Sequence, residues 1–220
     1  MSTLTEQRMD YANRNFDRYT TWAAAVCDGP YTPRDKLEWA IITAHCPFDK
    51  SVAGFLATRA VSGLQNLAEA LATAGVMAPG NKAAYITRLR HGDWEYPAAD
   101  YRDYRQRVKL PGLGHCKLSF AACLIDPFGA DVICLDTHML ACYGAPFSAQ
   151  RAYANLKLYE EVEDEVLAEA NAVGMPPFPY QWAVWDWWRA QTLHRPTTDH
   201  SFLWQSGPSS QQLPLFNALS

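Results

Sequence analysis

The chain lacks any segment that would carry it into or across a membrane. No apolar run approaches the roughly 18 residues that a membrane-spanning helix needs. The first residues, MSTLTEQRMD, contain no apolar core of the signal-peptide type. We therefore expect a cytoplasmic protein with no membrane partner, located in the cytoplasm of an infected cell if a bacteriophage encodes it.

The sequence also lacks the cysteine and histidine spacings that hold metal ions. Its six cysteines include no CxxC pair, and its six histidines show no zinc-site spacing. A chain of 220 residues does not need disulfides to be stable. We therefore expect reduced cysteines in the core, no metal site and no cofactor.

An excess of positive charge is missing as well. The 19 lysines and arginines are outnumbered by 23 aspartates and glutamates, which gives a net charge of -4. This balance excludes a broad basic surface for nucleic acid, because such binding depends on many Lys and Arg contacts with phosphates. Local basic stretches remain, either as DNA contacts or as ordinary solvated helix faces, and they contain Arg88, Arg90, His91, Arg102, Arg105, Arg107 and Lys109.

Helical periodicity dominates what is present, and 49% hydrophobic residues are enough for a core. The only good strand candidate is DVICL, residues 131–135. The sequence predicts an all-α domain over residues 1–194 and an irregular tail over 195–220. Helices are predicted at about 4–27, 32–47, 49–60, 62–74, 80–91, 98–107 and 115–125, from 137, twice within 148–172, and at 178–192.

The stretch from Lys109 to His115, KLPGLGH, predicts a tight link between two helices. Pro111 ends the preceding helix, and two glycines allow a sharp turn before the next helix begins near His115. Free amides at the start of that helix can bind a phosphate. Taken alone, the stretch predicts only a link between helices.

The longer segment LPGLGHCKLSFAACLIDPFGADVICLDTHML resembles the core of the helix-hairpin-helix DNA glycosylases, the superfamily of endonuclease III and adenine glycosylase. A weaker similarity extends over about residues 35–190. The resemblance implies a two-lobed helical fold, a hairpin motif near residues 100–125 and a cleft for double-stranded DNA between the lobes. It assigns DNA-backbone binding to Lys109, Leu110, Gly112, Leu113, Gly114 and His115.

Asp136 falls on the catalytic aspartate of that family, within the sequence LDTH. Such enzymes extrude a base from the duplex and then stabilise positive charge on the sugar as the glycosidic bond breaks. A carboxylate does this, so we predict that Asp136 is catalytic. Asp136 also precedes a predicted helix at Thr137, where it would serve as an N-cap, and the two roles are compatible.

Lys117 departs from the family pattern by one position. The imine-forming lysine of the bifunctional members corresponds to Cys116, and a shift of one residue turns a side chain by about 100° around a helix. We assign Lys117 a catalytic role and expect its apolar neighbours to lower its pKa and activate the amine. Two alternatives are a snorkelling surface lysine and a nucleophilic Cys116 at the helix start.

The base pocket is predicted from weaker matches. His45 stands where the family often has a glutamine that fills the gap left by the extruded base. We also assign Cys116, His138 and Trp185 to the pocket. The aromatic cluster around Trp185, with Trp182 and Trp188, is equally typical of core packing at helical spacing.

The resemblance leaves three functions open. The first is a monomeric DNA glycosylase without the iron-sulfur cluster of endonuclease III, because no four-cysteine group follows the last helix. The second is a base-tailoring enzyme similar to the phage thymine-hypermodification enzymes. In this chain Lys117 or an amino acid co-substrate would displace phosphate from 5-phosphomethyluracil and leave the glycosidic bond intact. The third is a DNA-binding module that has lost catalysis.

Overall fold

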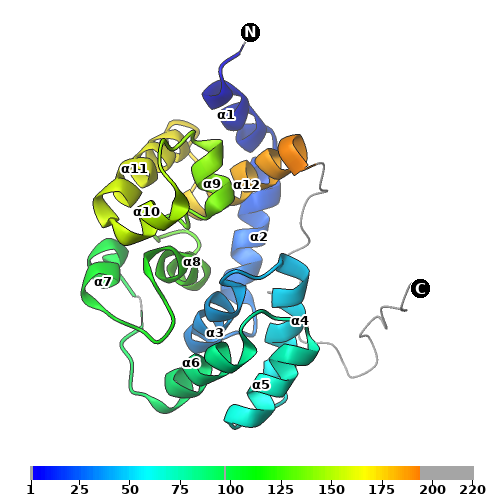
Figure 1. Cartoon of the computed structure of the whole chain (residues 1–220). Helices are drawn as coiled ribbons and strands as arrows, with labels where there is room; N and C mark the ends of the chain where they lie inside the picture. The colour runs from blue at the N-terminus through cyan, green and yellow to red at the C-terminus, as the bar shows by residue number, and fades with distance from the viewer. Residues whose placement is uncertain (1, 97, 194–220) are drawn as a thin grey trace.

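The computed structural model describes residues 2–96 and 98–193, in which all regular secondary structure is helical. The prediction of an all-α protein is confirmed. No helix in these residues is long and apolar enough to cross a membrane. The helices are α1 (Leu4–Arg14), α2 (Phe16–Asp28), α3 (Pro33–Thr43), α4 (Phe48–Arg59), α5 (Leu64–Thr73), α6 (Pro79–His91), α7 (Tyr101–Arg107), α8 (His115–Ile125), α9 (Thr137–Cys142), α10 (Ala149–Ala154), α11 (Leu156–Ala172) and α12 (Pro177–Leu193) (Figure 1).

The first predicted helix, residues 4–27, is in fact two helices. Asn15 leaves the helical conformation with φ -111° and ψ 17°, and its side-chain amide donates to the Tyr11 carbonyl oxygen at 2.8 Å. Asparagine side chains compete with helical hydrogen bonds in this way, which explains the break between α1 and α2. The predicted tail, residues 195–220, lies outside the described residues.

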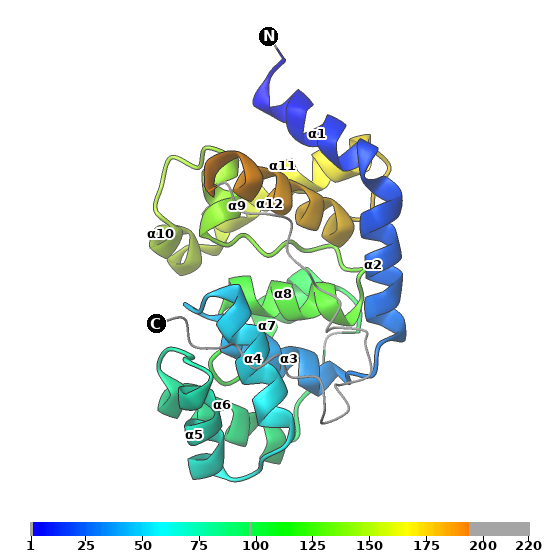
Figure 2. The same ribbon diagram turned by 90° about the vertical axis from the view of Figure 1, so that its right-hand side faces the viewer.

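The helices gather on both sides of α8. Figures 1 and 2 show α9 to α12 with α1 on one side, α3 to α6 on the other, and α2 running along both groups. Helix α2 contacts α12 and α8, while α3 contacts α8, α4 and α6. Residues 35–42 of α3 are all buried, including Trp39, so this helix is the centre of its group. The arrangement holds α8 between the two groups.

The strand candidate at 131–135 does not form a strand. No strand occurs in the described part of the chain, and residues 130–136 form an irregular connection between α8 and α9. Side chains satisfy the backbone amides that a sheet would otherwise pair. The Ile133 amide donates to Glu163 Oε1, the Cys134 amide to Gln181 Oε1, and the Leu135 amide to the Tyr159 hydroxyl, at 2.8, 2.8 and 2.9 Å. The apolar residues of this segment are buried without a neighbouring strand.

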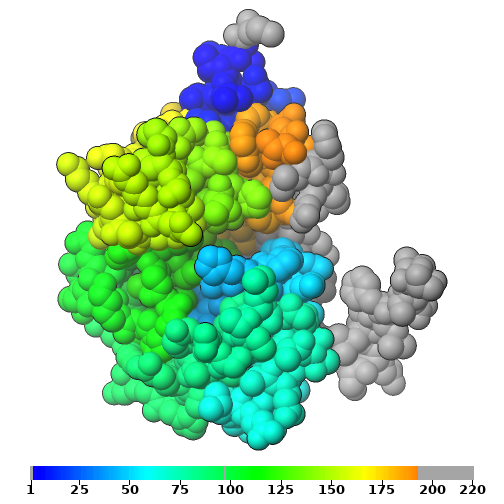
Figure 3. Space-filling view, viewed as in Figure 1, coloured from blue at the N-terminus to red at the C-terminus, as the bar shows by residue number. Residues whose placement is uncertain are grey.

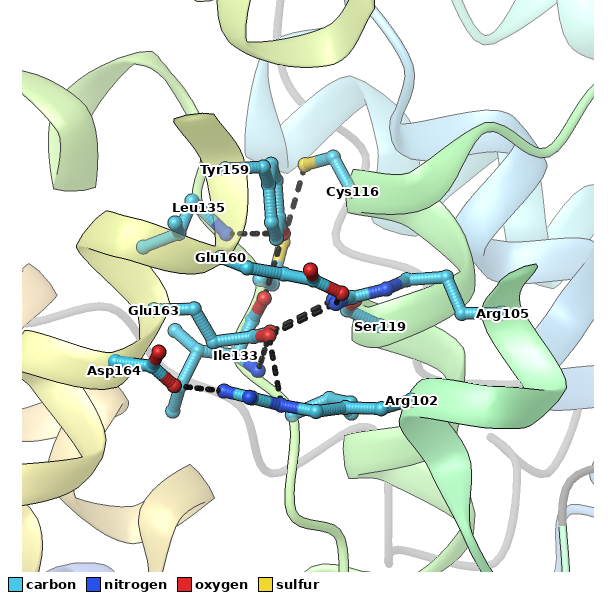
Figure 4. Close-up of polar contacts among 12 residues, drawn as sticks. Arg102, Arg105, Cys116, Ser119, Ile133, Leu135, Tyr159, Glu160, Glu163 and Asp164 are labelled. Atoms are coloured by element: carbon cyan, nitrogen blue, oxygen red, sulfur yellow. Dashed lines mark hydrogen bonds and ion pairs between the residues drawn. The ribbon is translucent and has the colours of Figure 1, made fainter. Parts of the chain in front are cut away.

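A buried ion pair fixes this connection to the helices around it. Arg105 of α7 is 1% exposed and donates to both carboxylate oxygens of Glu163 in α11, at 2.7 and 2.9 Å (Figure 4). The same guanidinium donates to Ser119 Oγ of α8 at 2.8 Å, while Tyr159 donates to the Ile133 carbonyl oxygen at 2.6 Å. The network therefore joins α7, α8, α11 and the segment that precedes Asp136.

Replacing Glu163 with Gln removes the buried carboxylate of this pair and leaves the buried Arg105 charge with only the more exposed Glu160 carboxylate, at 3.1 Å, as a counterion. We expect the free energy of unfolding to fall by about 3–5 kcal/mol. Urea denaturation followed by circular dichroism measures the loss. The control is Glu95→Gln at the exposed pair that Glu95 forms with Arg107, where no measurable change is expected. Equal stability of the two variants would contradict this role of Glu163.

Candidate functional site

A cavity of about 470 Å³ lies where the α3–α4 connection, the start of α8, the segment before α9, and α12 come together. The surface is hollowed where the end of α3 and the start of α4 face α9 (Figure 3). The cavity brings together most of the residues predicted from sequence. Those that line it are His45, Gly112, Gly114, His115, Cys116, Lys117, Asp136, His138 and Trp185.

The hairpin before α8 depends on its first glycine and on two buried leucines. Gly112 has φ +71°, and a Cβ atom there would lie 2.4 Å from Cδ2 of Tyr85. Leu110 and Leu113 are 5% and 6% exposed, so their side chains anchor the hairpin in the core. Any contact of these two leucines with DNA is therefore left to their backbone atoms. Lys109, Gly112 and Gly114 are exposed, as a phosphate-binding loop requires.

Helix α8 begins next to the cavity without a side-chain cap. Its N-cap residue is Gly114, which lines the cavity. The first amides of a helix have no intrahelical partner and carry partial positive charge, so this end suits an anion. His115 lies beside these amides, and its buried Nδ1 atom has no hydrogen-bond partner among the described residues. Burial lowers the pKa of His115, and the charges of Arg105 and Lys109 lower it further.

Most of the basic residues near the hairpin already have acidic partners. Arg90 pairs with Glu38, and Arg102, Arg105 and Arg107 each pair with carboxylates. Arg88 and Lys109 are exposed and take part in no ion pair within the described residues. The positive charge that remains for a phosphate is therefore small and local.

Asp136 is the N-cap of α9, as the capping alternative predicts, and it also lines the cavity. Its Oδ1 atom accepts from the amides of His138 and Met139 at 3.0 and 2.9 Å. Its Oδ2 atom accepts from Nε1 of Trp185 in α12 at 2.9 Å. Three donors thus fix the carboxylate, and the Trp185 ring in turn lies 4.1 Å from Cζ of Arg189.

Lys117 lies half-buried in the cavity wall, with Nζ 5.5 Å from the centroid of the Phe120 ring. The expected lowering of its pKa was wrong. Burial does lower the pKa of Lys117, but the negative potential of the Cys134 and Cys116 sulfurs and of the Asp136 carboxylate outweighs burial and leaves the pKa raised. The amine is therefore protonated at neutral pH.

Cys134 belongs to the site, although no sequence motif predicts this. Its Sγ atom lies 3.6 Å from Sγ of Cys116, and both thiols are buried in the cavity wall. The hydrogen bond with Cys134 lowers the pKa of Cys116 despite burial, whereas the pKa of Cys134 is raised. The two residues are 18 positions apart with no motif between them. Gln181 was also missed, although its position one helical turn before Trp185 was a usable signal.

His45 stands exposed at the edge of the cavity in a left-handed conformation, with φ +51°. Such a backbone is uncommon for a residue other than glycine and persists only where neighbours hold it. Lys82 of α6 provides this support, because its Nζ atom donates to the carbonyl oxygens of Ile42 and Ala44 at 2.8 and 2.6 Å.

Comparison of the chain with family models, curated proteins and solved structures finds no match. The functional assignment therefore rests on the residues and geometry described above.

NMR titration of the His115 imidazole tests the electrostatics of the α8 start. We expect a pKa below 6.5 in the free protein, so His115 is neutral at pH 7 and its contribution to stability is lost as the pH falls below about 6.5. Inorganic phosphate bound at the helix start should raise this pKa. The variant His115→Gln identifies the resonance. A pKa at or above 6.5 without phosphate would contradict the described environment.

Proposed function

We propose that the chain is an enzyme that acts on a base extruded from double-stranded DNA, and that it removes the base as a DNA glycosylase. One observation carries the proposal. The uncapped start of α8, the fixed Asp136 carboxylate and the exposed His45 all converge on one cavity. These are the three parts that extrusion and cleavage need, namely a backbone anchor, a catalytic anion and a gap-filling side chain.

The cavity suits a flat heteroaromatic ligand. Its volume lies within the roughly 300–1,000 Å³ that is usual for small-molecule sites, and its wall includes the rings of Phe120, Trp182 and Trp185. Aromatic walls stabilise an unstacked base by replacing its neighbours in the duplex. The neighbouring phosphate would be held by the α8 amides, with Lys109 close to the hairpin.

The proposed chemistry follows from the fixed position of Asp136. As the glycosidic bond breaks, its electron pair leaves with the base, and positive charge develops at the sugar carbon. The carboxylate stabilises this charge without reorganising, because the α9 amides and Trp185 already hold it. Water then adds to the sugar carbon, and the proton that it loses goes to the departed base anion, which leaves a neutral free base and an abasic site.

The position of Lys117 in the cavity wall, with a protonated amine, supports a second candidate function. A protonated amine cannot attack the sugar, but it can bind an anionic substituent on the base. In the second candidate the substrate is 5-phosphomethyluracil and an amino acid is the co-substrate. Its amine forms a C–N bond to the methylene carbon, the C–O bond to phosphate breaks, and the glycosidic bond stays intact.

Incubation with duplexes that contain uracil, oxidised, alkylated and 5-substituted pyrimidines separates these functions. Mass spectrometry of released bases and of digested nucleosides is the readout, with glycine as the trial co-substrate. Free base supports the glycosylase. A heavier nucleoside without abasic product supports the second candidate, and chemically unchanged DNA throughout would leave only a DNA-binding module.

The variant Asp136→Asn separates catalysis from capping. Asparagine keeps the N-cap, because its Oδ1 atom still accepts from the two α9 amides, but its Nδ2 donor would face Nε1 of Trp185. The melting temperature should therefore fall, but by less than in Asp136→Ala. We expect the rate of product formation to fall by about 100-fold or more, because the anion is lost. Asp136→Ala serves as the comparison, since it loses both the cap and the charge. Full activity of Asp136→Asn would refute a catalytic anion at this position.

Borohydride trapping tests the role of Lys117. We expect no covalent adduct with DNA at neutral pH, because the protonated amine cannot form an imine. Denaturing electrophoresis of the protein incubated with substrate duplex and borohydride reveals any adduct. An adduct that forms with the natural protein and disappears in Lys117→Met would show that the lysine is a nucleophile after all.

A further inference from the structure

Gln181 has a side-chain orientation that the backbone fixes. This residue of α12 is 4% exposed and lines the cavity, and its Oε1 atom accepts from the Cys134 amide at 2.8 Å. A backbone N–H can only donate, so the oxygen of the Gln181 amide must face Cys134. If the amide were reversed, Nε2 of Gln181 would face the Cys134 N–H, and two donors would oppose each other.

The opposite end of the same amide is an unused donor. The hydrogen bond that Gln181 makes with the described residues uses only its Oε1 atom. The Nε2 atom is not one of the fully buried atoms that lack a partner, so we infer that it is accessible from the cavity, where a ligand that supplies an acceptor takes the place of solvent. The cavity is the space in which such a ligand lies, because Gln181 forms part of its wall.

The peptide that orients Gln181 is itself held in place. The two amides that flank Cys134 donate to Glu163 and Tyr159, so the chain cannot rotate to release the Gln181 oxygen. The next residue along the α12 face, Trp185, is bonded to Asp136. The amide of Gln181 is therefore pre-organised in the wall of the cavity that Asp136 also lines, which strengthens its discrimination between ligands.

We propose that Gln181 is a specificity-determining residue that donates from Nε2 to a carbonyl oxygen of the extruded base. The cavity then accepts bases with an oxo group at this position, such as uracil and thymine derivatives or oxopurines. It rejects bases with an exocyclic amino group there, such as cytosine, because two donors would face each other. This inference rests on the proposed action on an extruded base, and it adds to that proposal the class of base that the cavity accepts.

The variant Gln181→Glu reverses the donor with little change of shape. One carboxylate oxygen still accepts from the Cys134 amide, while the other presents an acceptor to the cavity. The probes are two duplexes of the same sequence, one with a single U·G mispair and one with a single C·A mispair. Fluorescence anisotropy measures affinity, and 2-aminopurine beside the mispair reports extrusion. The control is Gln7→Glu, which makes the same charge change at an exposed position of α1.

The natural protein and Gln7→Glu should bind the uracil duplex about tenfold more tightly than the cytosine duplex, a difference of one hydrogen bond. Gln181→Glu should lose or reverse this preference. If 2-aminopurine reports extrusion but Gln181→Glu keeps the preference of the natural protein for the uracil duplex, the inference is overturned and the proposed function stays intact. If the 2-aminopurine fluorescence of neither duplex changes when the natural protein binds, both the inference and the proposed function are overturned.

NMR of the natural protein gives a second test that does not depend on the folding of a variant. The side-chain NH₂ resonances of Gln181 should shift on addition of the uracil duplex and stay in place with the cytosine duplex. Equal shifts with both duplexes, or no shift with either, would overturn the inference.

Discussion

Side chains from α11 and α12 hold the three backbone amides that precede Asp136, and the site depends on this constraint. Glu163, Gln181 and Tyr159 each accept from one of these amides. The connection between α8 and α9 therefore stays irregular, yet these three backbone amides are hydrogen-bonded as they would be in a strand of a sheet. Because Arg105 holds Glu163 from the opposite side, the position of Asp136 is linked to α7 and α8 as well.

The same constraint explains how one cavity combines distant parts of the sequence. The hairpin sets the start of α8, while the held connection places Asp136 in the wall of the same cavity. Lys82 independently holds the loop that carries His45. Lys82, Glu163 and Tyr159 lie on helices other than the segments that they hold, and none of the three needs to touch a substrate. Gln181 differs from them because it both holds the Cys134 amide and lines the cavity.

The sequence allowed prediction of what depends on local pattern. The helical class, the hairpin glycines and the capping role of Asp136 follow from residues that are close together in the chain. Properties that depend on distant residues were missed or misjudged. The pKa of Lys117 is raised because Cys134 and Asp136 come close only in the folded protein. The segment 131–135 has a strand-like composition, but its hydrogen-bond partners are side chains.

Photo-cross-linking tests most directly the central claim that the cavity receives a base from DNA. A duplex with one 5-bromouracil is irradiated with the protein, and the cross-linked peptide is identified by mass spectrometry. The account predicts attachment to a ring of the cavity wall, at Phe120, Trp182 or Trp185. Cross-links confined to residues outside the cavity, or none from a bound duplex, would contradict it.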